Sequence, residues 1–98
     1  MKLPRRHQHA IVSATREISI RNASGLHARP AAEFARCANR FQSEIWIVKS
    51  GARFSASSLI DIMRANLAQG TTVTLEAKGS DADAALEALA QLVDKFRD

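Results

Sequence analysis

A histidine and an arginine two residues apart are the side chains of this 98-residue chain best suited to chemistry. His27 and Arg29 fall in the segment Gly25-Leu26-His27-Ala28-Arg29-Pro30-Ala31-Ala32, which has the composition of a loop that enters a helix. The first turn of a helix is electropositive because its backbone N–H groups have no partners, so cationic side chains there predict a bound anion such as phosphate. An imidazole can also accept a phosphoryl group covalently as a nucleophile.

A serine further along the chain begins a second candidate site. Ser58 precedes a short apolar helix that we expect to end at about Ala65, and Asp61 follows three residues later, close to a capping box. The simplest interpretation of Ser58 is therefore a helix cap. Phosphoserine is also tolerated at a helix N-terminus, so the same position suits regulatory phosphorylation.

This short helix carries more apolar residues than one sheet face can bury. We expect Ile62 to face inward, and Leu59, Ile60 and Met63 to form an exposed docking patch beside His27. The alternative is that all four belong to the core. Arg36 lies two turns after Arg29 and is either a polar rim to this patch or a solvated charge.

Charge and composition exclude several classes of protein. The formal net charge is +4, but Lys2, Arg5 and Arg6 place +3 within residues 1–12 and leave the other 86 residues nearly neutral. This distribution argues against nucleic-acid binding, which requires a basic stripe on the folded surface. The sequence contains no run of about 18 apolar residues, so it predicts no membrane span. No apolar region follows the first cations, as it would in a secretory signal. Cys37 is the only cysteine and therefore forms no internal disulfide. We therefore expect a cytoplasmic protein without membrane insertion.

The elements that must position these residues are predicted from hydrophobic periodicity and turn residues. We expect a basic arm over residues 1–13 and one domain over residues 14–98, in the order βαββαβα. A two-layer α+β sandwich follows, with helices on one face of a mainly antiparallel sheet. The expected strands cover residues 14–21, 44–49, 52–56 and 71–77, the helices cover 28–39, 59–65 and 81–96, and turns cover 50–51, 69–70 and 78–80.

From about residue 14 to the C-terminus, the chain resembles the HPr phosphocarriers of the bacterial phosphotransferase system. The resemblance rests on the Gly25–Ala32 segment, on Ser55-Ala56-Ser57-Ser58-Leu59-Ile60-Asp61-Ile62-Met63, on the Gln69-Gly70-Thr71 turn and on the closing amphipathic helix. It implies an open-faced sandwich with a four-stranded antiparallel sheet under three helices. It also implies a carrier that takes a phosphoryl group from phosphorylated enzyme I and passes it to an enzyme II A domain or its nitrogen-branch equivalent. Such a carrier is a monomer, is not itself an enzyme and needs no cofactor.

The same resemblance implies roles for individual residues. His27 is the phosphoryl acceptor, through Nδ1 by family analogy, although the sequence alone does not choose the nitrogen. Arg29, with Ser24, Ala28 and Pro30, stabilises the phosphoryl group. Ser58 is the position that a dedicated ATP-dependent HPr kinase modifies in many bacteria. Ser24 departs from the asparagine of many relatives, and its shorter hydroxyl would orient the imidazole less firmly.

Two other functions are compatible with these features. A regulatory docking module of the same fold would act on kinases or transcription regulators, and retention of His27 favours the carrier over it. A nucleic-acid binder with a basic arm is disfavoured by the neutral domain and by the few exposed aromatic residues. His7 and His9 provide two metal ligands at most, so we expect no metal site. Both a sugar-uptake branch and a nitrogen-regulatory branch fit the sequence.

Overall fold

Buried side chains alternate with more exposed ones along Glu44–Lys49 (β2) and Thr72–Gly79 (β4), the central strands of a sheet that β1 (Val12–Ser19) and β3 (Ala52–Ser55) complete at its edges. The computed structural model describes residues 12–98. Its strands pair only in antiparallel fashion and lie in the order β1-β4-β2-β3, so β4 sits between β1 and β2. The antiparallel four-stranded sheet is thus confirmed.

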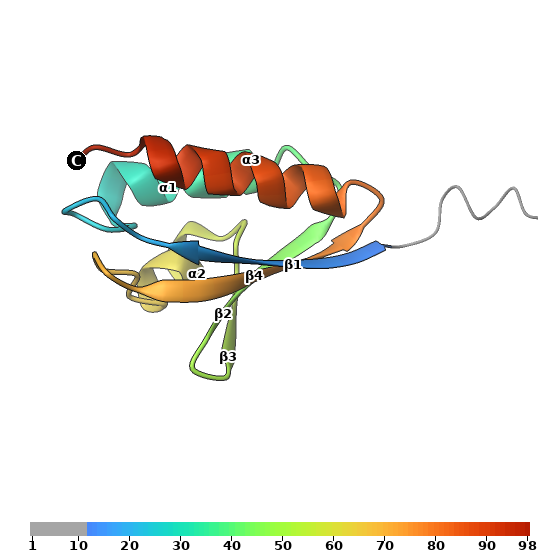
Figure 1. Cartoon of the computed structure of the whole chain (residues 1–98), viewed down its shortest axis with the longest axis horizontal. Coiled ribbons are helices and arrows are strands. Elements are labelled where there is room, and N and C mark those ends of the chain that lie inside the picture. The colour runs from blue at the N-terminus through green and yellow to red at the C-terminus, as the bar shows by residue number, and fades with distance from the viewer. Residues whose placement is uncertain (1–11) are drawn as a thin grey trace, which may run out of the picture.

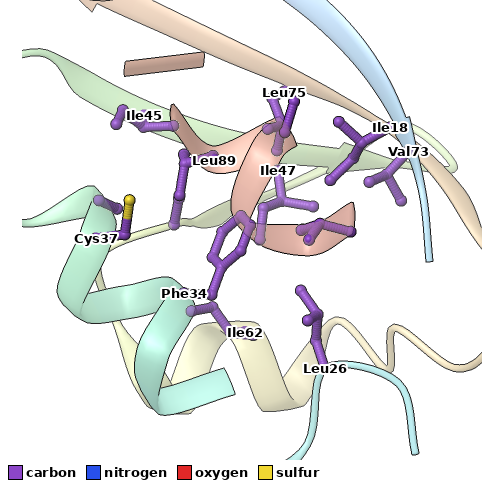
Figure 2. Packing of buried hydrophobic residues seen from close by; sticks show 14 of the residues in the cluster. Ile18, Leu26, Phe34, Cys37, Ile45, Ile47, Ile62, Val73, Leu75 and Leu89 are labelled. Atoms are coloured by element: carbon purple, nitrogen blue, oxygen red, sulfur yellow. The ribbon is translucent and has the colours of Figure 1, made fainter. Parts of the chain in front are cut away.

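The register of the strands places apolar pairs on one face of this sheet. Ile18 lies opposite Val73 in the β1–β4 pair, and Ile47 lies opposite Leu75 in the β2–β4 pair. All four side chains are buried and point into the same core (Figure 2). A slip of one residue would turn each of them to solvent, so burial fixes the register.

Three helices cover this apolar face: α1 (Ala28–Ala38), α2 (Leu59–Arg64) and α3 (Ala82–Lys95). Helices α1 and α3 run side by side along the sheet, while α2 packs against α1 and β3 (Figure 1). Phe34 of α1, Ile62 of α2 and Leu89 of α3 are completely buried and converge on the sheet residues (Figure 2). The open-faced α+β sandwich is therefore confirmed. Within residues 12–98, no helix has the length and hydrophobicity that a membrane span requires.

Several expected boundaries are corrected by the structure. The first strand begins at Val12, two residues before its expected start, and ends at Ser19 rather than at residue 21; residues 1–11 of the arm lie outside the described part. The expected turn at residues 78–80 is wrong at its first two positions, because β4 continues through Gly79, which pairs with Val12. Helix α3 ends at Lys95, so Phe96 and Arg97 follow the helix instead of completing it.

An acidic residue at the start of α3 ties this helix to the segment between α1 and β2. The carbonyl of Asp81 accepts the N–H of Ala85 at 2.9 Å, but its side chain makes no capping hydrogen bond to α3. Its carboxylate instead accepts the backbone N–H groups of Gln42 and Ser43, each at 2.9 Å, and the Ser43 hydroxyl. These bonds, with that from the Ser43 hydroxyl first, hold the pKa of the Asp81 carboxyl below its ordinary value. Asp81 therefore links the start of α3 to the segment that enters β2.

Candidate functional site

The loop between β1 and α1 is fixed to the core on both sides of Gly25. Leu26 is fully buried and points into the core (Figure 2), and its N–H donates to the Leu67 carbonyl at 2.9 Å. The N–H of Gly25 donates to the Asn22 carbonyl, and Gly25 has a φ of +68°. Because Leu26 is anchored, the next residue must emerge at the surface at the start of α1. The loop therefore presents His27 from a rigid base.

His27 occupies the N-cap position of α1. Its backbone is extended (φ −125°, ψ 161°), its side chain is half-buried, and it makes no capping hydrogen bond. Ala28 follows with a φ of +50°, a left-handed conformation that costs about 1 kcal/mol or more for a residue with a side chain. Strain of this kind collects at functional sites. Within the part of the chain that the structure describes, the His27 imidazole is thus not engaged in capping the helix.

The first turn of α1 leaves an anion site unfilled by the protein itself. It contains no acidic residue. Among residues 12–98, no hydrogen bond uses the N–H of Ala28 or Arg29. Pro30 has no N–H to offer and is buried in the same turn. An anion beside His27 would therefore meet two unused amide donors and the positive end of an 11-residue helix.

Arg29 is held in place by two carboxylates. Its guanidinium pairs with Glu33 at 3.0 Å, one turn along α1, and with Asp98 after the end of α3. The Arg29 side chain remains 64% exposed. Exposed pairs of this type are weak, so Arg29 can exchange a carboxylate for a phosphoryl group at little cost.

Asp98 also closes the loop that carries His27. Its carbonyl oxygen accepts the N–H of Ser24 at 2.8 Å, the Ser24 hydroxyl, and Asn22 Nδ2 at 3.3 Å. The Ser24 hydroxyl therefore serves this carbonyl, and the expected role of Ser24 toward the phosphoryl group stays a prediction. Figure 1 shows the chain returning to this loop after α3. The sequence provides no signal for contacts between residues about 70 positions apart, whereas the Arg29–Glu33 pair follows from its i,i+4 spacing.

The four apolar residues of α2 divide into one buried and three exposed side chains, as expected from the limited area of one sheet face. Ile62 is fully buried, while Leu59, Ile60 and Met63 are 42%, 71% and 44% exposed, so their expected exposure is confirmed. Helix α2 packs against α1. The segment after α2 carries Leu67, whose carbonyl accepts the N–H of Leu26 in the loop before His27. The patch thus belongs to the same end of the molecule as His27 (Figure 1).

Ser58 is the N-cap of α2, as expected. Its hydroxyl accepts the N–H of Asp61 at 3.2 Å. Asp61 does not complete a capping box, because its carboxylate accepts the N–H of Ser55 instead. At the other end of α2, Lys49 Nζ donates to the carbonyls of Ala65 and Asn66 at 2.9 Å each, a C-terminal cap that the sequence analysis did not anticipate.

The remaining candidates lie apart from the loop. Arg36 lies two turns after Arg29 on α1 and lines a groove between α1 and α3, and its expected role as a polar rim to the α2 patch stays a prediction. Cys37 is buried, and burial raises the pKa of its thiol against the opposing charge of Arg40, so Cys37 serves packing. No cluster of metal-ligating side chains occurs within residues 12–98, and His7 and His9 fall outside them.

Comparisons with known proteins agree on one family. Residues 14–95 match the family model described as the PTS HPr component phosphorylation site. The phosphocarrier protein NPr of Shewanella violacea is 44% identical over 79 residues, which cover 81% of this chain and 87% of NPr. A crystal structure of HPr from Thermoanaerobacter tengcongensis has 41% identity and a TM-score of 0.81, covering 83% of this chain and 91% of that one.

A regulatory relative is also similar. Crh, the catabolite repression protein of Bacillus subtilis, has 40% identity and a TM-score of 0.68, covering 84% of this chain and 94% of Crh. Its crystal structure is described as a dimer with a swapping domain.

Proposed function

Because the chain belongs to the HPr family of phosphocarriers of the bacterial phosphotransferase system, we propose that His27 accepts a phosphoryl group from phosphorylated enzyme I. His27 then passes this group to an enzyme II A domain or its nitrogen-branch equivalent. The observation that carries the proposal is the position of His27 at the N-cap of α1, where neither its imidazole nor the first amides of the helix are hydrogen-bonded to any residue of 12–98.

Each transfer is an in-line displacement at phosphorus. The lone pair of one imidazole nitrogen attacks the phosphorus atom while the bond between phosphorus and the donor atom of enzyme I breaks. In the second transfer, the nucleophile of the acceptor protein attacks the same phosphorus atom and displaces His27. The helix end stabilises the phosphoryl charge by about 0.3–1 kcal/mol at an exposed site. Arg29 leaves Asp98 and presents its planar fork to the phosphoryl oxygens. These modest terms suit a carrier, which must release its cargo readily.

The direct test is transfer of label from radioactive phosphoenolpyruvate through enzyme I to the purified chain. We expect one acid-labile phosphoryl group per chain, and its loss to an added enzyme II A domain. Failure of the chain to accept any label from active enzyme I would reject the carrier function.

The exposed patch of Leu59, Ile60 and Met63 is the proposed contact for both partners. We expect Ile60→Glu to raise the KM for the chain in transfer from enzyme I by about tenfold or more, because a carboxylate would be buried against an apolar partner surface. Stability should change by less than about 0.5 kcal/mol, since Ile60 is 71% exposed. Transfer kinetics and urea unfolding measure the two effects.

Val12 provides the matched control, because it is another exposed apolar residue and lies at the start of β1, away from the loop (Figure 1). Val12→Glu should leave the KM unchanged. Equal KM values for the two variants would show that the patch is not part of the docking surface.

Ser58 is the proposed regulatory site, modified by an ATP-dependent HPr kinase. We expect the kinase to label the wild type and Ser57→Ala but not Ser58→Ala. Phosphorylation should slow transfer from enzyme I at least about tenfold, because two negative charges would stand beside the docking patch. Ser58→Ala should also lower the free energy of unfolding by about 1 kcal/mol through loss of the cap. Label on Ser58→Ala, or unchanged transfer by the phosphorylated chain, would contradict this role.

A second candidate is a regulatory docking module, favoured by the similarity to Crh. This module would bind its target whether or not His27 is present, whereas the carrier depends on His27. We propose the cytoplasm as the compartment, in keeping with the single buried Cys37. We also propose a monomer, as the resemblance to the HPr phosphocarriers implies.

A further inference from the structure

A groove runs along the outer side of the helical layer, between α1 and α3. One hollow of about 360 Å³ is lined by residues including Arg36, Arg40, Ala88 and Gln91. An adjoining hollow of about 460 Å³ reaches Arg29 and Asp98. The two hollows share Glu33, Leu92 and Lys95, so they form one continuous depression, here called the α1–α3 groove.

The rim of the α1–α3 groove is positively charged. Arg36, Arg40 and Lys95 are exposed, and no ion pair within residues 12–98 involves any of them. The two acidic residues that line the groove, Glu33 and Asp98, both already pair with Arg29. Since the chain outside its basic arm is nearly neutral, this cluster is a local feature, and it attracts negative partners over roughly one Debye length, about 8–10 Å.

The spacing of these cations indicates an extended ligand. Arg29 and Arg36 lie on one stripe of α1, separated by about 10 Å along the helical rise, and Arg40 follows two residues after the helix ends at Ala38. One phosphate or carboxylate cannot contact all of them, whereas a segment of acidic polypeptide can. The half-buried Ala88 and Leu92 and the buried Cys37 form an apolar floor between the charges. An amphipathic acidic segment has the matching pattern.

The groove is continuous with the candidate phosphoryl site. Its second hollow is lined by Arg29, two residues after His27. A protein that approaches His27 therefore already covers one end of the groove. The docking patch and the groove lie on different elements near this site. The patch is on α2, and the groove lies between α1 and α3.

We infer that the α1–α3 groove binds an acidic segment of a protein that exchanges a phosphoryl group with His27, and so forms a second docking element. The inference rests on the proposed function and adds the chemistry of the partner. Arg40 and Lys95 hold the segment at a distance from the reacting atoms. They act on binding and not on the displacement step.

The test is the double variant Arg40→Glu/Lys95→Glu, measured as acceptor from enzyme I and as donor to an enzyme II A domain. In at least one of the two reactions, at low ionic strength, we expect a KM at least about tenfold above wild type with unchanged kcat. Added salt should raise the wild-type KM toward that of the variant. The control Arg53→Glu/Lys78→Glu changes the same number of charges on other elements, β3 and β4. It also removes the pair of Arg53 with Glu76, so KM is compared where all variants are fully folded, and there it should equal that of the wild type.

Direct binding separates failure of this inference from failure of the carrier function. Titration of the ¹⁵N-labelled His27→Ala variant with enzyme I and with the enzyme II A domain requires no phosphoryl transfer. For the partner that shows the kinetic effect, we expect the amide signals of Gln91 and Lys95 to shift. If the wild type accepts label but the groove variant and the control have equal KM values in both reactions, the groove is not a docking element. Binding of a 20-nucleotide RNA at Gln91 and Lys95, without a response to either protein, would also overturn the inference.

Discussion

Replacing His27 by alanine is expected to abolish acid-labile phosphorylation of the chain by enzyme I and phosphoenolpyruvate. The substitution removes the nucleophile while leaving Arg29 and the amides of the first turn in place. Because His27 makes no capping bond and is half-buried, the free energy of unfolding should change by no more than about 0.5 kcal/mol. Label incorporation should fall to background, and transfer to an enzyme II A domain should stop with it.

The chain contains its own control for this experiment. His7 and His9 are its other two histidines, so the double variant His7→Ala/His9→Ala tests whether any histidine suffices. This variant should accept label at the wild-type rate. Unchanged labelling of His27→Ala would overturn the assignment, whereas loss of label only in the arm variant would move the acceptor to the arm.

The experiment also separates the carrier from the regulatory module. A docking module needs the surface of α2 but not the imidazole, so binding to its target would survive His27→Ala and be lost in Ile60→Glu. A carrier loses transfer in both variants, through loss of kcat in the first and through a higher KM in the second. The two functions therefore predict different pairs of outcomes from the same proteins.

The fold was predictable because its elements are set by local patterns. Alternation along β4 and the surplus of apolar residues on α2 follow from the pleat and from the size of one helix face. The inward position of Ile62 and the exposure of Ile60 depend on little else. The turn expected at Gly79 fails because a glycine is a turn signal only when no partner strand extends past it, and Val12 extends β1 to that point.

The candidate site was predictable in its chemistry and less so in its support. His27 and Arg29 stand out because cationic or cationisable side chains at a helix start indicate a bound anion. The contacts of Arg29 and Ser24 with Asp98 join residues about 70 positions apart, and only the packing of α3 beside α1 brings them together. The groove follows from the same packing, since its α1 and α3 rims are ordinary solvated charges when each helix is considered alone.

The anchoring of the loop leads to the second large effect, which we expect for Gly25→Ala. Gly25 has a φ of +68°, where an alanine costs about 1–2 kcal/mol. An added Cβ would overlap the Leu67 carbonyl oxygen and lie 3.0 Å from Ala68 Cα. That carbonyl is the acceptor for the N–H of Leu26, so relief of the overlap breaks the bond that holds the loop. The loss of stability should total about 3–5 kcal/mol.

The catalytic consequence should exceed what stability alone explains. Leu26 immediately precedes His27, so a shift of the loop by about 1 Å would misplace the imidazole relative to the unused amides and slow transfer by about 100-fold. Gly51→Ala is the matched control, because Gly51 also has a positive φ (+82°) but has no atom within 4 Å of an added Cβ. Gly51→Ala should lower the free energy of unfolding by about 1 kcal/mol and leave the rate of phosphoryl transfer unchanged. Stopped-flow transfer, measured where both variants are fully folded, distinguishes the two. Equal rates for the two variants would show that the Leu26–Leu67 bond does not position His27.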